Sequence, residues 1–313
     1  MDLRIGSKRI KAIYKGCNVV HGISVNSRLW HGAEGKVCLY NKVGTIVGDD
    51  KVYYNTLLTS KYPKIEVLPG GIAKKITQDY YSCSLIVDGG EVASYYVPKD
   101  NSDHSSKLPP PDVTVQSGGV IKEITTVGDV EINVKEYGTI NNATFSASHR
   151  YDGSNPVFEY ARLYVSSGGV VDKVLIPGIY GETSQGTVVV SNGGLVKNIT
   201  CSLNATVSAV GGGLVENAVI NSGASMTVYS GGTGHGITIN SGCSLCVSSG
   251  GTASATTLNR GGSMTVFQKG ISNDTIVSSG GSLYISSGGT AFNVTSETGA
   301  WIYAQYGGVI TYK

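Results

Sequence analysis

Glycine recurs at a fixed interval of 19 residues through the C-terminal part of the chain. One series holds seven glycines: Gly194, Gly213, Gly232, Gly251, Gly270, Gly289 and Gly308. A second series keeps the same interval: Gly223, Gly242, Gly261, Gly280 and Gly299. A strict period of this length indicates a repeat architecture, in which each unit packs only against its neighbours along one axis.

Each unit combines two turn signals with short segments of alternating polarity. Residues 226–244 read MTVYSGGTGHGITINSGCS, with S-G-G early in the unit and N-S-G late. Alternation of apolar and polar residues is typical of half-buried strands, and corner glycines can supply the positive φ of a sharp bend. We expect these side chains to point inward: Met226, Val228, Ile237, Ile239, Leu245, Val247, Thr256, Leu258, Met264, Val266, Thr275, Val277, Leu283, Ile285 and Val294.

Stacking of the units buries what one unit alone leaves exposed, so the chain is predicted to be an all-β solenoid. Coils of one register start at residues 65, 84, 113, 132, 163, 188, 207, 226, 245, 264, 283 and 302, which makes 12 coils. Three steps exceed 19 residues, and they place insertions near 98–111, 148–160 and 178–186. We predict an N-terminal attachment or capping region with a small β cap over 1–64, and the β-solenoid over 65–313.

The segment TVYSGGTGHGITINSGCSLCVSSGGTASATTL resembles the AIDA-type repeats of bacterial autotransporter adhesins. The resemblance extends closely over 188–313 and more loosely over 65–187. It implies a right-handed parallel β-helix and a surface-exposed or adhesive role. Adhesins of this type carry a signal peptide and a C-terminal membrane barrel, and this sequence shows neither pattern, so secretion by that route is not expected.

The N-terminal sequence LRIGSKRIKAIYKGCNVV, followed by SRLWHG, resembles short segments of tail-associated proteins of phages and prophages. The resemblance covers only the segment from Leu3 to Gly32. It implies an N-terminal virion-attachment piece followed by a projecting β-helix, as in tail fibres and tailspikes. Such proteins are assembled in the host cytoplasm and need no signal peptide.

Positive charge is concentrated at the N-terminus. Residues 1–51 hold nine Lys or Arg and four acids, although the whole chain has a net charge of only +2. We predict an electrostatic dock onto a virion tail protein or another structural protein, and the alternative is a solvated cap surface. The basic residues form no long run with interleaved aromatics, so nucleic acid is not an expected partner. The predicted docking residues are Arg4, Lys8, Arg9, Lys11 and Lys15.

Several aromatic residues fall at outward positions of the repeat. They are Tyr229, Phe267, Tyr284, Tyr303 and Tyr306. Aromatic rings on a regular sheet face can stack on sugar rings, which predicts contacts with a host-surface glycan. The alternative is strand propensity combined with aromatic packing between coils.

Catalysis, cofactors and metals are not expected. Glycoside hydrolysis generally needs two carboxylates close together. The register brings Glu216 beside His235, whereas Asp274 lies about three coils from Glu216, too far to complete a pair. Cys243 and Cys246 form a C-x-x-C pair without the second pair or the histidines of a zinc site, and we interpret them as free thiols.

The interpretation that accounts for both resemblances is a non-enzymatic phage or prophage tail fibre or spike component, located in the virion, that contacts a host-surface glycan or protein. Two alternatives stay open: a bacterial cell-surface adhesin resembling an autotransporter passenger, and a polysaccharide-degrading tailspike. Spikes are commonly homotrimers, whereas a solenoid with its own sealed core can also stand as a monomer.

Overall fold

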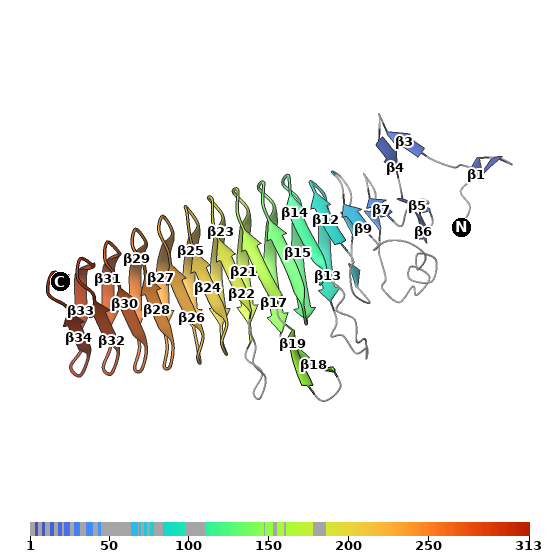
Figure 1. Cartoon of the computed structure of the whole chain (residues 1–313). Helices are drawn as coiled ribbons and strands as arrows, with labels where there is room; N and C mark the ends of the chain where they lie inside the picture. Colours follow the sequence, from blue (N-terminus) through green and yellow to red (C-terminus); the bar gives the residue numbers. More distant parts are fainter. Residues whose placement is uncertain are drawn as a thin grey trace.

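The computed structural model describes residues 84–97, 110–146, 161–177 and 186–313 continuously, the hairpin strands within 148–159, and short strands and single positions before residue 84. All regular structure in these parts is β-strand, and most of it lies in two long parallel sheets (Figure 1). Within the described residues there is no helix long and apolar enough to cross a membrane.

Two sheets run the length of the solenoid, and we name them by the length of their regular strands. The short-strand sheet has 13 strands: β7 (Lys36–Leu39), β9 (Lys64–Val67), β12 (Ser84–Asp88), β14 (Asp112–Gln116), β16 (Val130–Val134), β20 (Ala161–Val165), β22 (Thr187–Val190), β24 (Thr206–Ala209), β26 (Ser225–Val228), β28 (Ser244–Val247), β30 (Ser263–Val266), β32 (Ser282–Ile285) and β34 (Trp301–Ala304). The long-strand sheet has 14: β8 (Val43–Gly44), β10 (Ile72–Ala73), β11 (Ile76–Thr77), β13 (Glu91–Val97), β15 (Val120–Val127), β17 (Thr139–Ser146), β21 (Val170–Ile176), β23 (Leu195–Cys201), β25 (Leu214–Ile220), β27 (Thr233–Ile239), β29 (Thr252–Leu258), β31 (Ile271–Val277), β33 (Thr290–Ser296) and β35 (Val309–Tyr312).

The remaining described strands form antiparallel hairpins outside the strand order of the two sheets. They are β1 (Arg4–Ile5) with β2 (Lys8–Arg9), β3 (Ile13–Lys15) with β4 (Asn18–Val20), β5 (Gly22–Val25) with β6 (Arg28–His31), and β18 (Ser148–Asp152) with β19 (Asn155–Glu159).

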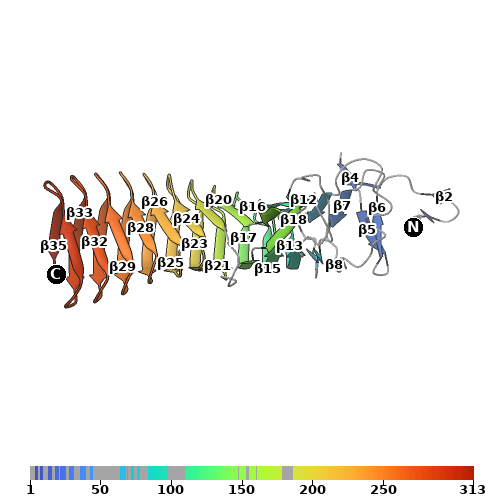
Figure 2. The same cartoon turned by 60° about the horizontal axis from the view of Figure 1, so that its bottom comes forward.

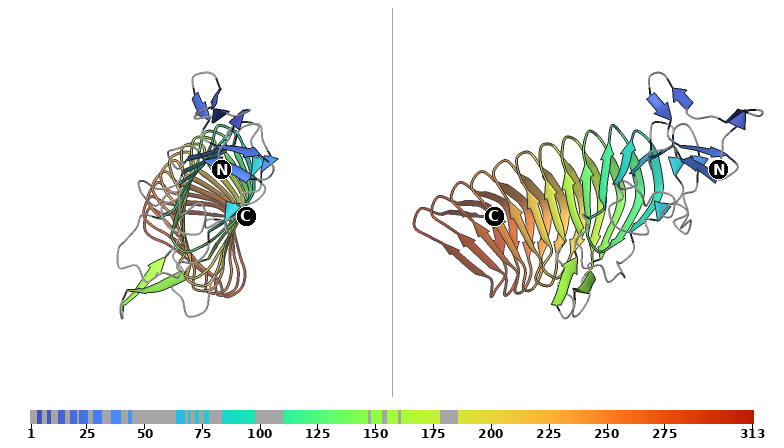
Figure 3. Two further views of the ribbon diagram at one scale, coloured as in Figure 1. Left: turned by 90° about the vertical axis from the view of Figure 1, so that its right-hand side faces the viewer. Right: turned by 45° about the vertical axis from the view of Figure 1, so that its right-hand side comes forward.

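Each coil consists of one short strand, an early corner, one long strand and a late corner that leads to the next coil (Figure 3). Every regular strand pairs in parallel with the equivalent strand of the next coil, as when Met226 pairs with Leu245 and Ile220 with Ile239. The predicted right-handed parallel β-helix is confirmed.

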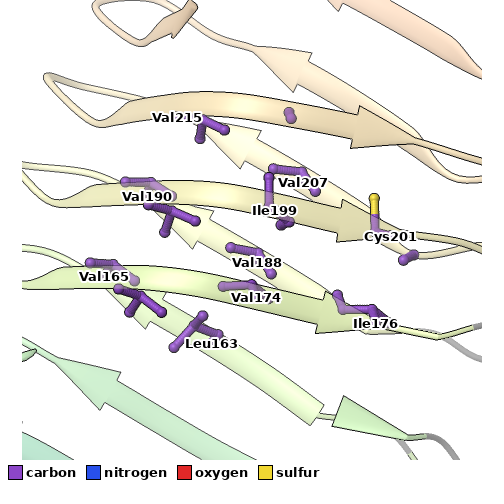
Figure 4. Close-up of a cluster of buried hydrophobic side chains, with 14 of the residues drawn as sticks. Leu163, Val165, Val174, Ile176, Val188, Val190, Ile199, Cys201, Val207 and Val215 are labelled. Atoms are coloured by element: carbon purple, nitrogen blue, oxygen red, sulfur yellow. The ribbon is translucent and has the colours of Figure 1, made fainter. Parts of the chain in front are cut away.

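The core lies between the two sheets as continuous columns of side chains (Figure 4). Leu163, Val188 and Val207 form part of one column from the short-strand sheet, and Val174 and Ile199 face them from the long-strand sheet. All the side chains that the alternation predicted to point inward are buried. The apolar columns therefore hold the coils together, as expected for a solenoid.

The long strand bends at its centre, which strict alternation did not predict. In coil after coil one residue there has positive φ, at Asn198, Asn217, Gly236, Ala255, Asp274 and Asn293. The residue before it also points outward, so the inward positions of β27 are Gly234, Ile237 and Ile239. Asparagine suits this backbone and also bonds between coils, because Asn217 Nδ2 donates to Asn198 Oδ1 at 3.2 Å.

The two glycine series have different physical causes. Late-corner glycines such as Gly242 have positive φ, +73° there, as predicted. The series through Gly213 and Gly232 does not have positive φ, and that part of the expectation was wrong. These glycines pass over the previous coil, where a Cβ on Gly232 would lie 2.2 Å from the carbonyl oxygen of Ala209.

The predicted register needs two corrections near its start. Ile65 pairs with Leu85, not with residue 84, because the turn between β12 and β13 is one residue shorter than in later coils. The sheets also begin one coil earlier than residue 65, since β7 pairs with β9 and β8 with β10. Lys36 pairs with Lys64 there, and because this interval is longer than the regular period, the 19-residue repeat does not predict the coil.

Downstream of β12, the three intervals between paired residues that exceed 19 residues all occur at the same corner of the coil. In the long-strand sheet they lie between the paired residues Val92 and Ile121, Ile140 and Val171, and Val171 and Val196. Each of these steps falls between the end of a long strand and the start of the next short strand, which is the late corner of the coil. The β18–β19 hairpin is the described part of the second insertion; it projects below the coils in Figure 1 and is drawn in front of them in Figure 2.

Candidate functional site

The outward side of the short-strand sheet, over its last five coils, is an uncharged surface of hydroxyl and aromatic side chains. We call it the neutral face. It consists of three columns: Ser225, Ser244, Ser263, Ser282 and Trp301; Thr227, Cys246, Thr265, Tyr284 and Tyr303; and Tyr229, Ser248, Phe267, Ser286 and Gln305. None of these side chains carries a formal charge.

The strand pleat produces this face. In β30 the buried residues Met264 and Val266 alternate with the half-buried Ser263 and Thr265. Alternation continues one residue beyond the strand, where Phe267 is exposed and its N–H donates to the Val247 carbonyl of the previous coil at 2.9 Å. The third column is therefore held in register by backbone hydrogen bonds, although it lies just outside the strands.

Four of the five aromatics predicted to contact glycan lie on the neutral face. Tyr229, Phe267 and Tyr303 are 46%, 44% and 49% exposed, and Tyr284 is half-buried. Tyr303 stacks on Tyr284 with ring centroids 5.6 Å apart. Tyr284 and Tyr303 therefore do pack between coils, which was the alternative to glycan contact. About half of Tyr303 nevertheless remains open to solvent.

Tyr306 was predicted to contact glycan but lies outside the neutral face, whereas Trp301 was not predicted and lies on it. Tyr306 is fully exposed, but it belongs to the early corner and not to the three columns. Trp301 was missed: it is 53% exposed and stacks on Tyr303 with centroids 5.9 Å apart. The register contained the signal, because Trp301 occupies the position of Ser282 one coil later and pairs with it.

The aromatic rings cross the neutral face obliquely. Tyr229 and Phe267 lie in the third column, Tyr284 and Tyr303 in the second, and Trp301 in the first. The stripe begins at the coil of β26 and ends at that of β34. Adjacent coils are spaced by about 4.8 Å, so it spans about 19 Å along the solenoid.

The same side of the sheet is charged further upstream. Asp112, Glu131 and Arg162 follow one another in a single column, and Asn133 donates to Glu131 Oε1 at 3.4 Å. Asp112 and Glu131 are thus neighbouring carboxylates, upstream of the coils in which the sequence predicts no acid pair. The outward positions lose their charge after β20, because Thr187 and Val189 of β22 and Thr206 and Ser208 of β24 are uncharged as well. The neutral face is the part of this uncharged region that carries exposed aromatic side chains.

The long-strand sheet carries the residues that were considered for catalysis. Glu216 pairs with His235 as the register predicted, and His235 Nδ1 lies 2.9 Å from Ser254 Oγ. Among the described residues, His, Cys, Asp and Glu side chains form no group of three that could hold a metal ion.

Three cysteine side chains are described, and all three are free. Cys201 and Cys243 are buried, whereas Cys246 is half-buried in the middle column of the neutral face. Partial burial raises the pKa of the Cys246 thiol above its usual value. Cys246 is therefore mostly protonated at neutral pH, and it provides a chemical probe of the face.

The predicted N-terminal dock lies outside the described side chains. Arg4, Lys8, Arg9 and Lys15 fall on β1, β2 and β3, whose side chains are not described, and Lys11 lies outside the described residues altogether. Docking through these residues stays a prediction.

Comparison with known proteins relates the chain to adhesin stalks. Residues 208–262 match a family described as "Adhesin of bacterial autotransporter system, probable stalk". The fold is similar to a solved structure described as "Crystal structure of TibC-catalyzed hyper-glycosylated TibA55-350 fragment". That match has a TM-score of 0.62 and 20% identity, and it covers 89% of this chain and 95% of the other. No curated protein matches the chain significantly.

The family match falls on the regular coils, since residues 208–262 extend from β24 to the corner before β30. It agrees with the AIDA-type resemblance of the repeats. The structural match supports the same β-helical fold over nearly the whole chain. Neither comparison supports a tail-associated N-terminus or a place in a virion.

Proposed function

We propose that the chain is the β-helical stalk of an adhesin on a bacterial cell surface. The match of residues 208–262 to an autotransporter adhesin stalk carries this proposal. The function expected first, a phage tail component, gives way to what was held as the alternative. Nothing in the proposed role requires catalysis.

The physical character of the regular coils fits an exposed stalk. Consecutive coils bury unbroken apolar columns, and each strand lies between two others except at the ends of the sheets. Repeated identical interfaces make a rod whose length grows with coil number. The outward positions of the last coils are mainly Ser, Thr and Asn, which remain hydrated without attracting counter-ions.

Surface display is the direct test. Intact cells of the bacterium that encodes the chain would be treated with a protease that cannot enter them, and the protein followed with an antibody against the regular coils. We expect loss of the full-length signal, while a cytoplasmic marker stays intact. A deletion strain should adhere less to host cells or to abiotic surfaces, and re-expression should restore adhesion.

Purified phage particles from the same bacterium provide the opposing measurement. A protein confined to virions, with none accessible on intact cells, would overturn the adhesin proposal and restore the tail interpretation. Full resistance to external protease, with the protein in the cytoplasm alone, would overturn both.

A further inference from the structure

We propose that the neutral face is a binding site for neutral polysaccharide, along which a run of pyranose rings stacks on the oblique aromatic stripe. The inference gives the proposed adhesin a ligand class and depends on that function only for its biological setting. Binding by the purified full chain can succeed or fail independently of surface display.

Charge defines the ligand class. A carboxylated or sulfated sugar needs a cation or a set of strong donors, and the neutral face offers no Lys, Arg or His. Most of its positions carry the hydroxyl of Ser or Thr, and Gln305 adds an amide. Such groups can donate to and accept from sugar hydroxyls without the desolvation cost of a charge.

The aromatic rings provide the apolar part of the contact. Trp301 and Tyr303 stack at an interplanar angle of 22°, and Tyr303 and Tyr284 at 21°, so the three ring planes are nearly parallel. Trp301 and Tyr303 each remain about half exposed. A large amphipathic ring with an open surface is suited to the C–H face of a pyranose, whose hydroxyls point sideways.

Spacing favours an extended chain over a single sugar. Tyr229 and Phe267 lie in one column with the coil of Ser248 between them. Two coils separate the rings by about 10 Å, close to the length of two pyranose rings in an extended β-linked chain. Weak contacts at successive rings of one polymer add up as multivalent binding.

The residue composition argues against a protein partner. Protein interfaces are enriched in Arg and Met as well as aromatics, and they close around a buried apolar centre. The neutral face has no Arg, Met, Leu, Ile or Val, and Ser or Thr surrounds its rings. A hydroxyl surface with regularly placed rings is better matched to a sugar polymer.

The repeat itself supplies substitutions that keep the fold. Phe267→Ser places in the third column the residue that stands there at Ser248 and Ser286, and Tyr303→Thr copies Thr227 and Thr265. Phe292→Ser is the matched control. Phe292 lies on the outward side of the long-strand sheet and is 41% exposed, close to the 44% of Phe267.

Affinity electrophoresis tests the proposal with polymers of defined charge. The full chain would migrate through gels containing hydroxyethyl cellulose, β-1,3-glucan, galactomannan or dextran, with carboxymethyl cellulose as the anionic counterpart of the first. We expect retardation by at least one neutral polymer, weaker retardation by the anionic one, and little change with salt. Phe267→Ser and Tyr303→Thr should each weaken binding by about three- to tenfold, and Phe292→Ser should not.

Three results would overturn the proposal: no neutral polymer slows the protein, the anionic polymer slows it more, or Phe292→Ser weakens binding as much as Phe267→Ser. Protection of Cys246 offers a measurement without substitution of any ring. A bound neutral polymer should slow alkylation of Cys246, detected by mass spectrometry. Retardation without this protection would place the ligand elsewhere on the molecule.

Discussion

Tyr303 stacks on Tyr284, the residue at the same position one coil earlier, with the two ring planes 21° apart. Trp301 stacks on Tyr303 as well, with the two ring planes 22° apart. The contact joins the last two strands of the short-strand sheet, β32 and β34. One set of rings therefore serves two purposes: it binds the final coil to the preceding one, and it presents an aromatic surface to solvent.

Removal of the Tyr303 ring should loosen the last coil. Tyr303→Thr deletes the stacks with Tyr284 and Trp301 while keeping a residue that the column accepts, so about 1 kcal/mol of local stability should be lost. Hydrogen exchange at the N–H groups of Trp301 and Gln305, which donate to the previous coil, should become roughly fivefold faster. Tyr306→Ser is the control, because Tyr306 is 100% exposed. Equal acceleration in both variants would show that the stack contributes nothing.

Close approach between coils predicts a severe effect at Gly232. A Cβ there would lie 2.2 Å from the carbonyl oxygen of Ala209, a backbone atom that cannot move aside cheaply. Gly232→Ala should therefore lower the free energy of unfolding by about 3 kcal/mol or more, seen as a lower urea midpoint.

The matched variant is Gly242→Asn at the late corner. Gly242 has a φ of +73°, and no heavy atom lies within 4 Å of its added Cβ. Asn adopts this conformation readily, so the cost should stay below about 1 kcal/mol. If Gly242→Asn lowered the free energy of unfolding more than Gly232→Ala, the distinction between close approach and backbone conformation would be wrong.

Sequence periodicity was sufficient for most of the fold, because a constant interval carries the register from coil to coil. Met226, Leu245 and Met264 are buried in one column, as their regular spacing predicts. Prediction failed where local backbone geometry intervenes. The positive φ at Asn217 turns two successive residues outward, and a period of two contains no such step.

The candidate site was predictable in part. Outward placement of Tyr229, Phe267, Tyr284 and Tyr303 follows from alternation, and the same register would have included Trp301. Stacking of Tyr303 on Tyr284 and on Trp301 depends on side-chain rotamers, which spacing does not determine. The position of the charged column through Glu131 relative to the neutral face could not be predicted either, because it depends on which strands pair across insertions of unequal length.

An unpaired hydroxyl in the core predicts a stabilising substitution. Thr256 Oγ1 is buried and has no hydrogen-bond partner. Thr256→Val keeps the shape and removes the uncompensated polar group, so the free energy of unfolding should rise by about 1 kcal/mol. Thr275→Val, one coil later in the same column, should act in the opposite direction, because the Thr275 hydroxyl is hydrogen-bonded to Ser272. Urea midpoints of the two variants measure the difference, and a shift of the same sign in both would refute it.

Burial of the Cys201 thiol predicts a loss of stability at high pH. Desolvation by burial, with a smaller contribution from Cys243, raises the pKa of Cys201 from 9.0 to about 12. The folded state thus keeps the thiol protonated while the unfolded state ionises above pH 9, so the stabilising contribution present below that pH declines as pH rises toward 12. The fall should be roughly 1 kcal/mol per pH unit.

Cys201→Val isolates this contribution. Valine fits a column whose neighbours are Ile176 and Ile220, and it does not titrate. Lys and Tyr residues titrate alike in both proteins, so the difference in urea midpoint between wild type and variant, followed from pH 8 to pH 11, reports the thiol. We expect the wild type to lose stability relative to Cys201→Val as pH rises above 9. A constant difference over that range would show that Cys201 is as accessible to hydroxide in the folded chain as in the unfolded one.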